Sequence, residues 1–247
     1  MSGGVERTPD GPAGAGKPRC WHLTLPPTAY EAAWHLQTRL VAAKQARRIT
    51  SDVVMMLEHP PVFTLGRRGG RDNLTVAETF LQQKGIPVVQ VERGGNITYH
   101  GPGQLIVYAI MDLKARRLAV VDFVTLLEEV MIRTADEWGV TAERNPLNRG
   151  VWVGPRKLGS VGIAIRKGIS FHGLALNIRT DLEPFTWINP CGLPNVGVTS
   201  LVQASGQDIA MTAARRKATQ HIASIFDIDL APIDLPDLQN LMDAANF

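Results

Sequence analysis

The stretch from residue 151 to residue 178 constrains the fold most, because it holds three strand-like segments in close succession. The segments are Val151–Val153, Leu158–Ile165 and Ile169–Ile178, all rich in apolar and β-branched residues. Between them lie tight turns at Gly154-Pro155-Arg156 and at Lys167-Gly168. Connections this short join antiparallel neighbours. The stretch therefore predicts an antiparallel meander.

Helix-like and strand-like patterns are mixed in the rest of the chain, without strict alternation. Apolar spacing predicts helices beginning near Thr28, between Thr75 and Gly85, and over 121–138, 209–226 and 236–245. Thr28 with Glu31 and Thr75 with Glu78 match the capping-box pattern. Further strands are predicted over 52–58, 62–66, 87–92 and 104–112. This mixture predicts an α+β (mixed α/β) fold.

Composition narrows the class of protein. The chain has 247 residues, 45% hydrophobic, which suits one catalytic domain over 19–230 with a Gly/Pro-rich flexible leader over 1–18 and a C-terminal tail or helix over 231–247. The net charge of +3, without a basic run carrying aromatics, argues against nucleic acid. No apolar run approaches the ~20 residues of a membrane span. Only two cysteines occur, so we expect a reduced, cytoplasmic setting.

The segment from Arg93 to Gln104 is the first candidate site. Four glycines and a proline among its twelve residues let the backbone approach a ligand closely. A plain hairpin turn would explain the glycines. It would not explain why Arg93, Tyr99 and His100 stand in the same turn.

Cys191 is the second candidate. It stands in the turn Asn189-Pro190-Cys191-Gly192-Leu193-Pro194, which would hold a thiol in a defined place. Such a thiol is a nucleophile if its proton is removed. The alternative is a buried, inert cysteine, which is how Cys20 is interpreted.

Lys157 is the third candidate, at the entrance to a predicted strand. A lysine desolvated in a cleft can act as a base; the alternative is a solvated turn lysine. His172 stands before Gly173 in another predicted strand. It could be a base for Cys191 or a structural histidine.

Together these segments closely resemble the lipoyl(octanoyl) transferase family, within the biotin/lipoyl protein ligase fold. The matching pieces occur in the family's order: RGGNITYHGPGQL at 93–105, GPRKLGSVGI at 154–163, SFHGLALNI at 170–178, INPCGL at 188–193 and TSL at 199–201. One departure is Gly159, where the family more often has alanine or another small side chain.

The resemblance implies a mixed, largely antiparallel sheet flanked by helices. It places the acyl-thioester cysteine on Cys191 and the lysine that activates it on Lys157. His172 is a possible supporting residue. The implied substrate-binding residues are Arg93, Gly94, Gly95, Asn96, Ile97, Thr98, Tyr99, His100, Ser160, Val161, Gly162, Gly173, Leu174 and Ala175.

The resemblance also implies the reaction and its partners. Octanoyl would pass from octanoyl-acyl carrier protein, through Cys191, to a lysine on lipoyl domains of 2-oxoacid dehydrogenase complexes and on the glycine cleavage H protein. The donor's phosphopantetheine belongs to the carrier, so no cofactor, metal or ATP is expected. We further expect a monomer that binds neither nucleic acid nor membrane.

Two alternatives remain. An ATP-dependent lipoate-protein ligase shares the fold and a similar Gly-rich segment, but it forms an acyl-adenylate and needs no cysteine. A non-catalytic module that binds acylated carrier domains would have no reason to place Cys191 and Lys157 in these contexts.

Overall fold

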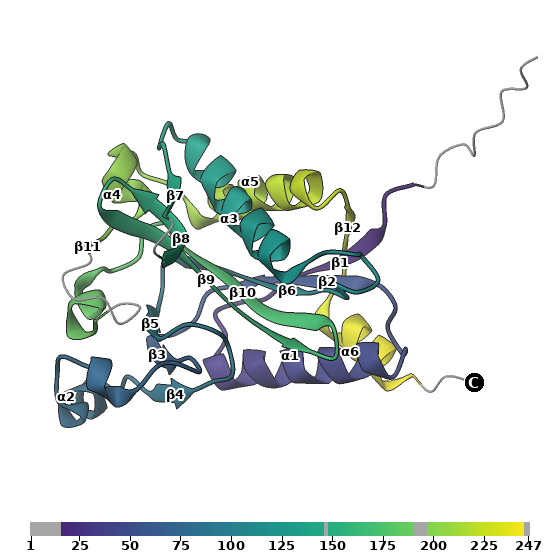
Figure 1. Cartoon of the computed structure of the whole chain (residues 1–247), viewed down its shortest axis with the longest axis horizontal. Helices are drawn as coiled ribbons and strands as arrows, with labels where there is room; N and C mark the ends of the chain where they lie inside the picture. Colours follow the sequence, from purple (N-terminus) through teal and green to yellow (C-terminus); the bar gives the residue numbers. More distant parts are fainter. Residues whose placement is uncertain (1–15, 146–147, 190–196, 245–247) are drawn as a thin grey trace, which may run out of the picture.

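A mixed sheet with helices on both faces organises the molecule (Figure 1). The computed structural model describes residues 16–145, 148–189 and 197–244. The strands of the large sheet, in spatial order, are β12 (Asp229–Pro232), β1 (Arg19–Thr24), β2 (Asp52–Leu57), β6 (Gln104–Ile110), β10 (Ile169–Asn177), β9 (Arg156–Arg166), β8 (Asn148–Val153) and β7 (Glu143–Asn145), with β11 (Gly197–Val198) paired to β9.

The pairing in this sheet is largely antiparallel. The predicted meander is confirmed as β8, β9 and β10, which pair antiparallel in sequence order, and β10 continues the antiparallel pattern to β6. Parallel pairing occurs where β1 meets β2 and β12, and where β11 meets β9. The predicted fold class is therefore confirmed.

Helices cover both faces of the sheet. Figure 1 shows α3 and α5 on one face and α1 and α6 on the other. The helices are α1 (Tyr30–Gln45), α2 (Glu78–Gln83), α3 (Val120–Asp136), α4 (Leu201–Ser205), α5 (Met211–Ile225) and α6 (Leu235–Asp243), with 3₁₀ turns η1 (Arg71–Asn73) and η2 (Glu183–Trp187). Within the described ranges, no helix is both long and apolar enough to cross a bilayer.

The large sheet has one hydrophobic core on each face. Burial on both faces explains why the sequence of β2 is almost entirely apolar. Successive side chains of a strand point to opposite faces. Val54 and Met56 accordingly join the core beneath α3 and α5, whereas Val53, Met55 and Leu57 join the core beneath α1 and α6. A strand buried on both faces has no polar alternation.

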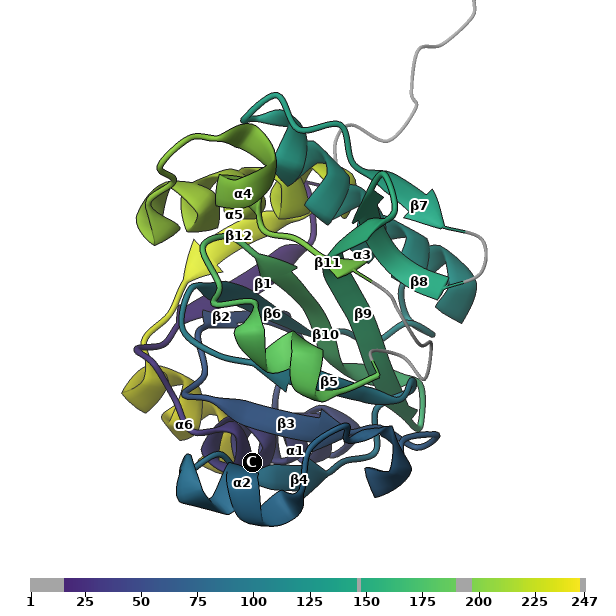
Figure 2. The same cartoon turned by 90° about the vertical axis from the view of Figure 1, so that its left-hand side faces the viewer.

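A small three-stranded sheet, with a core of its own, lies beside one end of the large sheet. Its strands are β4 (Val88–Gln90), β3 (Val62–Leu65) and β5 (Ile97–His100). Its core includes Phe63, Leu81 and Phe185. In Figure 2 this sheet lies on one side of the ends of β9 and β10, and β7 and β8 lie on the other.

Both predicted capping boxes are wrong. α1 begins at Tyr30 and α2 at Glu78, and neither has a side-chain cap. The hydroxyl of Thr28 donates to the Pro26 carbonyl at 2.7 Å, and that of Thr75 donates to the Thr186 carbonyl at 3.0 Å. A threonine hydroxyl that serves a neighbouring carbonyl does not cap a helix.

The proposed division into leader, catalytic domain and tail stays a prediction. Two observations bear on its C-terminal boundary. β12 spans residue 230 and pairs with β1. The following helix, α6, buries Leu238 and Met242 in the core that it shares with α1.

Candidate functional site

A cavity of about 950 Å³ opens where the small sheet meets β9 and β10. Three of its walls come from segments singled out in the sequence: the Gly-rich segment, β9 and β10. The predicted residues that line it are Arg93, Gly94, Gly95, Asn96, Ile97, Thr98, His100, Lys157, Ser160, Val161, Gly162, His172, Gly173, Leu174 and Ala175. Tyr99 does not line the cavity; its ring packs 5.3 Å from that of Phe63 and 5.5 Å from that of Phe185.

The Gly-rich segment lies directly on β9. The Gly94 N–H donates to the Ile163 carbonyl at 2.8 Å. A Cβ at residue 162 would lie 3.0 Å from Arg93 Cδ and 3.3 Å from the Gly94 carbonyl oxygen, so glycine permits the approach. Because the Gly94 N–H is already bonded, it is not a donor for a substrate oxyanion.

Arg93 holds this segment to the small sheet from inside. Its side chain is 7% exposed. The guanidinium donates to the Thr64 carbonyl at 2.7 Å, to the Thr64 hydroxyl at 2.8 Å, and to the Gly94 carbonyl at 3.1 Å. Arg93 therefore positions the loop as well as lining the cavity.

Lys157 lies at another part of the cavity wall, on β9, and is only 4% exposed. Its Nζ donates to Asn148 Oδ1 at 2.8 Å and to the Arg149 carbonyl at 2.9 Å. It also lies 5.4 Å from the ring centroid of Trp152. The solvated-turn alternative for Lys157 is therefore wrong: its side-chain nitrogen is held in a buried cradle on β8.

The cradle depends on an unusual backbone at Gly150. This residue has φ +119°, a conformation rarely adopted by side-chain-bearing residues. A Cβ there would collide with the Gly159 carbonyl oxygen and would lie 2.9 Å from Lys157 Cε. Glycine thus lets β8 pass close to the lysine stem.

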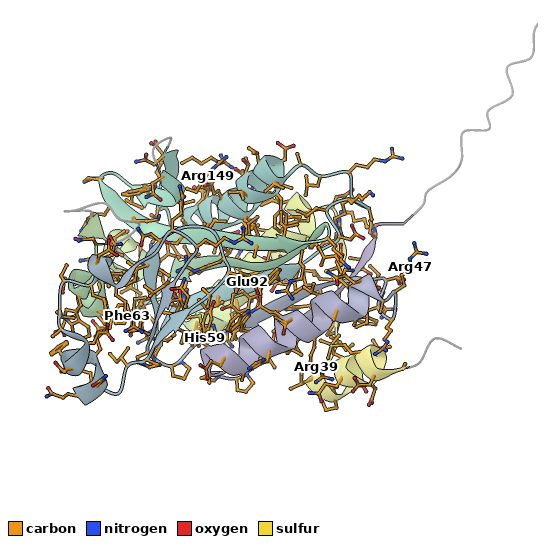
Figure 3. The ribbon with its side chains drawn as sticks, turned by 60° about the horizontal axis from the view of Figure 1, so that its bottom comes forward. Arg39, Arg47, His59, Phe63, Glu92 and Arg149 are labelled. Carbon is orange, nitrogen blue, oxygen red and sulfur yellow. The ribbon has the colours of Figure 1, made fainter. Side chains whose placement is uncertain are left out.

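Glu128 on α3 braces the same turn. Its carboxylate is 1% exposed and accepts the Gly150 N–H at 2.8 Å. It also pairs with Arg149 at 3.2 Å and with Arg144 at 3.5 Å. Figure 3 shows Arg149 near one edge of the molecule. A buried carboxylate in α3 therefore fixes the strand that holds Lys157.

The inner wall of the cavity is aromatic: it is formed by Tyr30, His100, Tyr108 and His172, beside the buried guanidinium of Arg93. His172 Nδ1 lies 3.4 Å from the Tyr30 hydroxyl, and His59 Nε2 lies 2.7 Å from the Tyr108 hydroxyl. Burial lowers the pKa of His59 to about 4 and that of His172 to about 3. Burial also holds the pKa of His100 well below its usual value. The three imidazoles are neutral at pH 7.

His172 and Lys157 do not form a catalytic pair. His172 lies opposite Ile163 in the β9–β10 ladder, six residues along β9 from Lys157. Six residues of strand span roughly 20 Å. One thiol cannot contact both side chains, so the structure favours the structural interpretation of His172.

Cys191 lies outside the described residues. The chain that follows it is bonded to Lys157: Val198 of β11 pairs with Lys157, and the Thr199 N–H donates to the Lys157 carbonyl at 2.9 Å. On the other side, the Asn189 N–H donates to the Asn73 carbonyl at 2.8 Å. Cys20 is fully buried, and burial raises the pKa of its thiol to about 12, which makes it inert.

Several lining residues were not found from the sequence. They are Tyr30, Arg68, Tyr108, Val124, Arg144, Asn145, Asn148, Arg149 and Ile163. Most stand in segments without a recognisable motif, and only the fold brings them to the cavity. Among the residues described, no three His, Cys, Asp or Glu side chains gather so as to hold a metal ion.

The fold of this chain is that of solved lipoate protein ligases. The chain aligns with a bipartite lipoate protein ligase solved with its E2 lipoyl domain from Thermoplasma acidophilum, with TM-score 0.65 and 17% identity, covering 91% of both chains. That likeness concerns the fold.

Sequence comparison identifies the family. Residues 29–230 match the lipoyl protein ligase A/B catalytic domain, and the chain belongs to this family. It is 48% identical over 206 residues to a Desulfotalea psychrophila protein named octanoyltransferase, covering 83% of this chain and 92% of the relative. An octanoyltransferase of Syntrophobacter fumaroxidans is 42% identical, covering 89% and 96%. The predicted family and enzyme class, an acyltransferase, are confirmed.

Proposed function

We propose that this protein transfers an octanoyl group from octanoyl-acyl carrier protein to a lysine of lipoyl domains, through a thioester on Cys191. The observation that carries the proposal is the cradle of Lys157: a buried amino group beside a cavity, on a residue whose backbone is bonded to the segment that follows Cys191. The names of the relatives support the octanoyl group.

In the first half-reaction, the Cys191 sulfur attacks the thioester carbonyl of the donor. Neutral Lys157 accepts the thiol proton. The bond between the carbonyl carbon and the phosphopantetheine sulfur breaks, and Lys157 returns the proton to the departing sulfur. One thioester replaces another, so the exchange is near balance and needs no ATP or other cofactor.

In the second half-reaction, the amine of the acceptor lysine attacks the same carbonyl. The bond to the Cys191 sulfur breaks, and Lys157 passes an amine proton to that sulfur. An amide is more stable than a thioester, so this step drives the cycle. Two successive half-reactions predict ping-pong kinetics.

The proposed acceptors are the lipoyl domains of 2-oxoacid dehydrogenase complexes and the glycine cleavage H protein. The solved lipoate ligase with its E2 lipoyl domain shows that this fold works with such an acceptor in another protein. We propose a cytoplasmic enzyme, because a free reactive thiol persists in a reducing compartment.

Intact-protein mass spectrometry tests the proposal. The enzyme is mixed with octanoyl-acyl carrier protein without ATP, beside Cys191→Ala and the matched control Cys20→Ala. We expect one octanoyl adduct on wild type and Cys20→Ala, none on Cys191→Ala, and discharge by added lipoyl domain. Transfer only after ATP and free octanoate are supplied would instead identify a ligase. Full turnover by Cys191→Ala would refute the nucleophile.

A further inference from the structure

The charge of the cavity wall is not explained by an octanoyl chain or a neutral thioester. The described lining includes no Asp or Glu side chain. It includes five cationic side chains: Arg68, Arg93, Arg144, Arg149 and Lys157. A concave site lined by one sign of charge attracts a ligand of the other sign.

Four of these cations already have partners within the protein. Arg93 binds Thr64, and Lys157 binds Asn148. Arg144 and Arg149 pair with acidic residues of α3. Arg68 differs from them: its guanidinium has neither a hydrogen bond nor an ion pair to any residue that the structure describes, and its side chain is exposed.

The backbone of Arg68 is nevertheless held in place. Its N–H donates to the Gly95 carbonyl at 3.1 Å. The preceding residue, Arg67, donates to the Arg93 carbonyl at 2.9 Å, and Gly66 donates to the Asn96 carbonyl at 3.1 Å. Three successive backbone hydrogen bonds therefore fasten this loop to the Gly-rich segment, so that the Arg68 side chain extends from a fixed point at the rim of the cavity.

The cavity has a buried inner wall and a solvent-exposed rim. Tyr30, Tyr108 and His172 on its inner wall are each at most 5% exposed. Arg68 is at the exposed rim. An apolar acyl chain gains most from the buried side, whereas a charged group remains hydrated at the rim.

We propose that Arg68 binds the phosphate ester of the acyl donor while the acyl chain enters the cavity. This inference rests on the proposed function, because it assumes a thioester donor. A guanidinium presents paired N–H groups that match two phosphate oxygens. The phosphodiester of a carrier's phosphopantetheine and the pyrophosphate of an acyl-coenzyme A share this chemistry.

The test compares thioester donors that differ only in phosphate. Loading of Cys191 is followed by rapid-quench intact mass spectrometry with octanoyl-pantetheine, octanoyl-phosphopantetheine, octanoyl-coenzyme A and octanoyl-acyl carrier protein. Wild type is compared with Arg68→Gln. The matched control is Arg67→Gln, because Arg67 is the adjacent exposed arginine and does not line the cavity.

We expect Arg68→Gln to lower kcat/KM for the phosphorylated donors about 5- to 10-fold, as for one partly exposed charge-assisted contact, through KM rather than kcat. Octanoyl-pantetheine should be used at the wild-type rate, and Arg67→Gln should resemble wild type with every donor. Whichever donor, the acyl carrier protein or coenzyme A, loses more kcat/KM in Arg68→Gln is the source of the phosphate that Arg68 recognises.

Three outcomes would overturn the inference. An equal loss with octanoyl-pantetheine would mean that Arg68 supports the loop rather than the phosphate. A loss confined to the carrier protein would mean that Arg68 contacts an acidic surface of the carrier. An unchanged rate with all donors would mean that it contacts neither. Failure of every donor to load wild-type Cys191 would instead refute the proposed function.

Discussion

Asn148 offers the sharpest test of how Lys157 is positioned. Its amide oxygen accepts a hydrogen bond from Lys157 Nζ at 2.8 Å, and among the described residues the Arg149 carbonyl also accepts from Nζ, at 2.9 Å. Asn148→Ala removes the first acceptor and leaves the second. The change leaves Tyr30, Tyr108 and His172 of the inner cavity wall in place.

The expected magnitude follows from this geometry. A hydrogen bond to a charged group contributes about 1.5–3 kcal/mol, which corresponds to roughly 10- to 150-fold in a rate. Because the Arg149 carbonyl still holds the ammonium, we expect the lower end, about a 10-fold slower loading of Cys191. Asn148→Asp should be slower still at neutral pH, since a carboxylate holds Lys157 protonated, and should recover as the pH rises.

The assay is single-turnover loading from octanoyl-acyl carrier protein at several pH values, with guanidinium unfolding as a check on stability. Asn240→Ala is a suitable control, because Asn240 is an exposed residue of α6 outside the cavity. A loading rate for Asn148→Ala within twofold of wild type, with the fold intact, would refute the positioning role. A pH profile of Asn148→Asp that matches wild type would show that Lys157 is not the proton acceptor.

Three further predictions concern stability and the second thiol. Glu128→Gln should lower the free energy of unfolding by about 1–3 kcal/mol, less than for a fully buried ion pair because the paired arginines stay partly exposed; a loss below 0.5 kcal/mol in guanidinium unfolding would contradict the bracing role. Burial lowers the pKa of His59 to about 4, so its contribution to stability is complete above pH 6.5 and declines as the pH falls toward 4. Wild type should therefore lose about 2 kcal/mol more than His59→Gln between pH 7 and pH 5, and parallel losses would be the contrary result. Iodoacetamide should label the native protein at Cys191 and leave Cys20 unmodified until unfolding, since Cys20 is fully buried; peptide mapping that finds Cys20 labelled in the native protein would show that this core opens.

The sequence predicted those strands and helices that are specified by residues within or next to the element itself. The meander over 151–178 was recognisable because its turns contain Gly154 and Gly168, which both have positive φ in the structure. The helix over 121–138 was recognisable from its apolar face and from the Gly139 stop, which also has positive φ. In each case the residues that specify the structure lie within the element or next to it.

The brace of Lys157 could not be predicted in the same way. Glu128 and Gly150 are 22 residues apart, and their hydrogen bond exists only because α3 packs over β8. In the sequence Glu128 is an ordinary helical carboxylate. Arg68 could not be recognised from the sequence either, because its position depends on backbone hydrogen bonds between its loop and the Gly-rich segment.

Gly159 shows how packing explains a departure from the family pattern. A Cβ at this position would lie 2.6 Å from Met131 Sδ and 3.1 Å from the Ala175 carbonyl oxygen. Methionine is flexible, so alanine would require this side chain to move rather than the sheet. Gly159 therefore fits a core in which Met131 fills the space that a larger residue on β9 would occupy.

Strand periodicity explains why one predicted residue of the Gly-rich segment does not line the cavity. Residues 93–100 were all predicted to bind substrate, as one turn. The structure makes Ile97–His100 a strand that pairs with β3, so alternate side chains face opposite ways. Thr98 and His100 line the cavity, whereas Tyr99 packs into the small sheet's core together with Ile97, which also reaches the cavity wall. Tyr99 therefore serves the site by holding β5 in place, and Tyr99→Phe, which keeps the ring, should leave acyl loading unchanged.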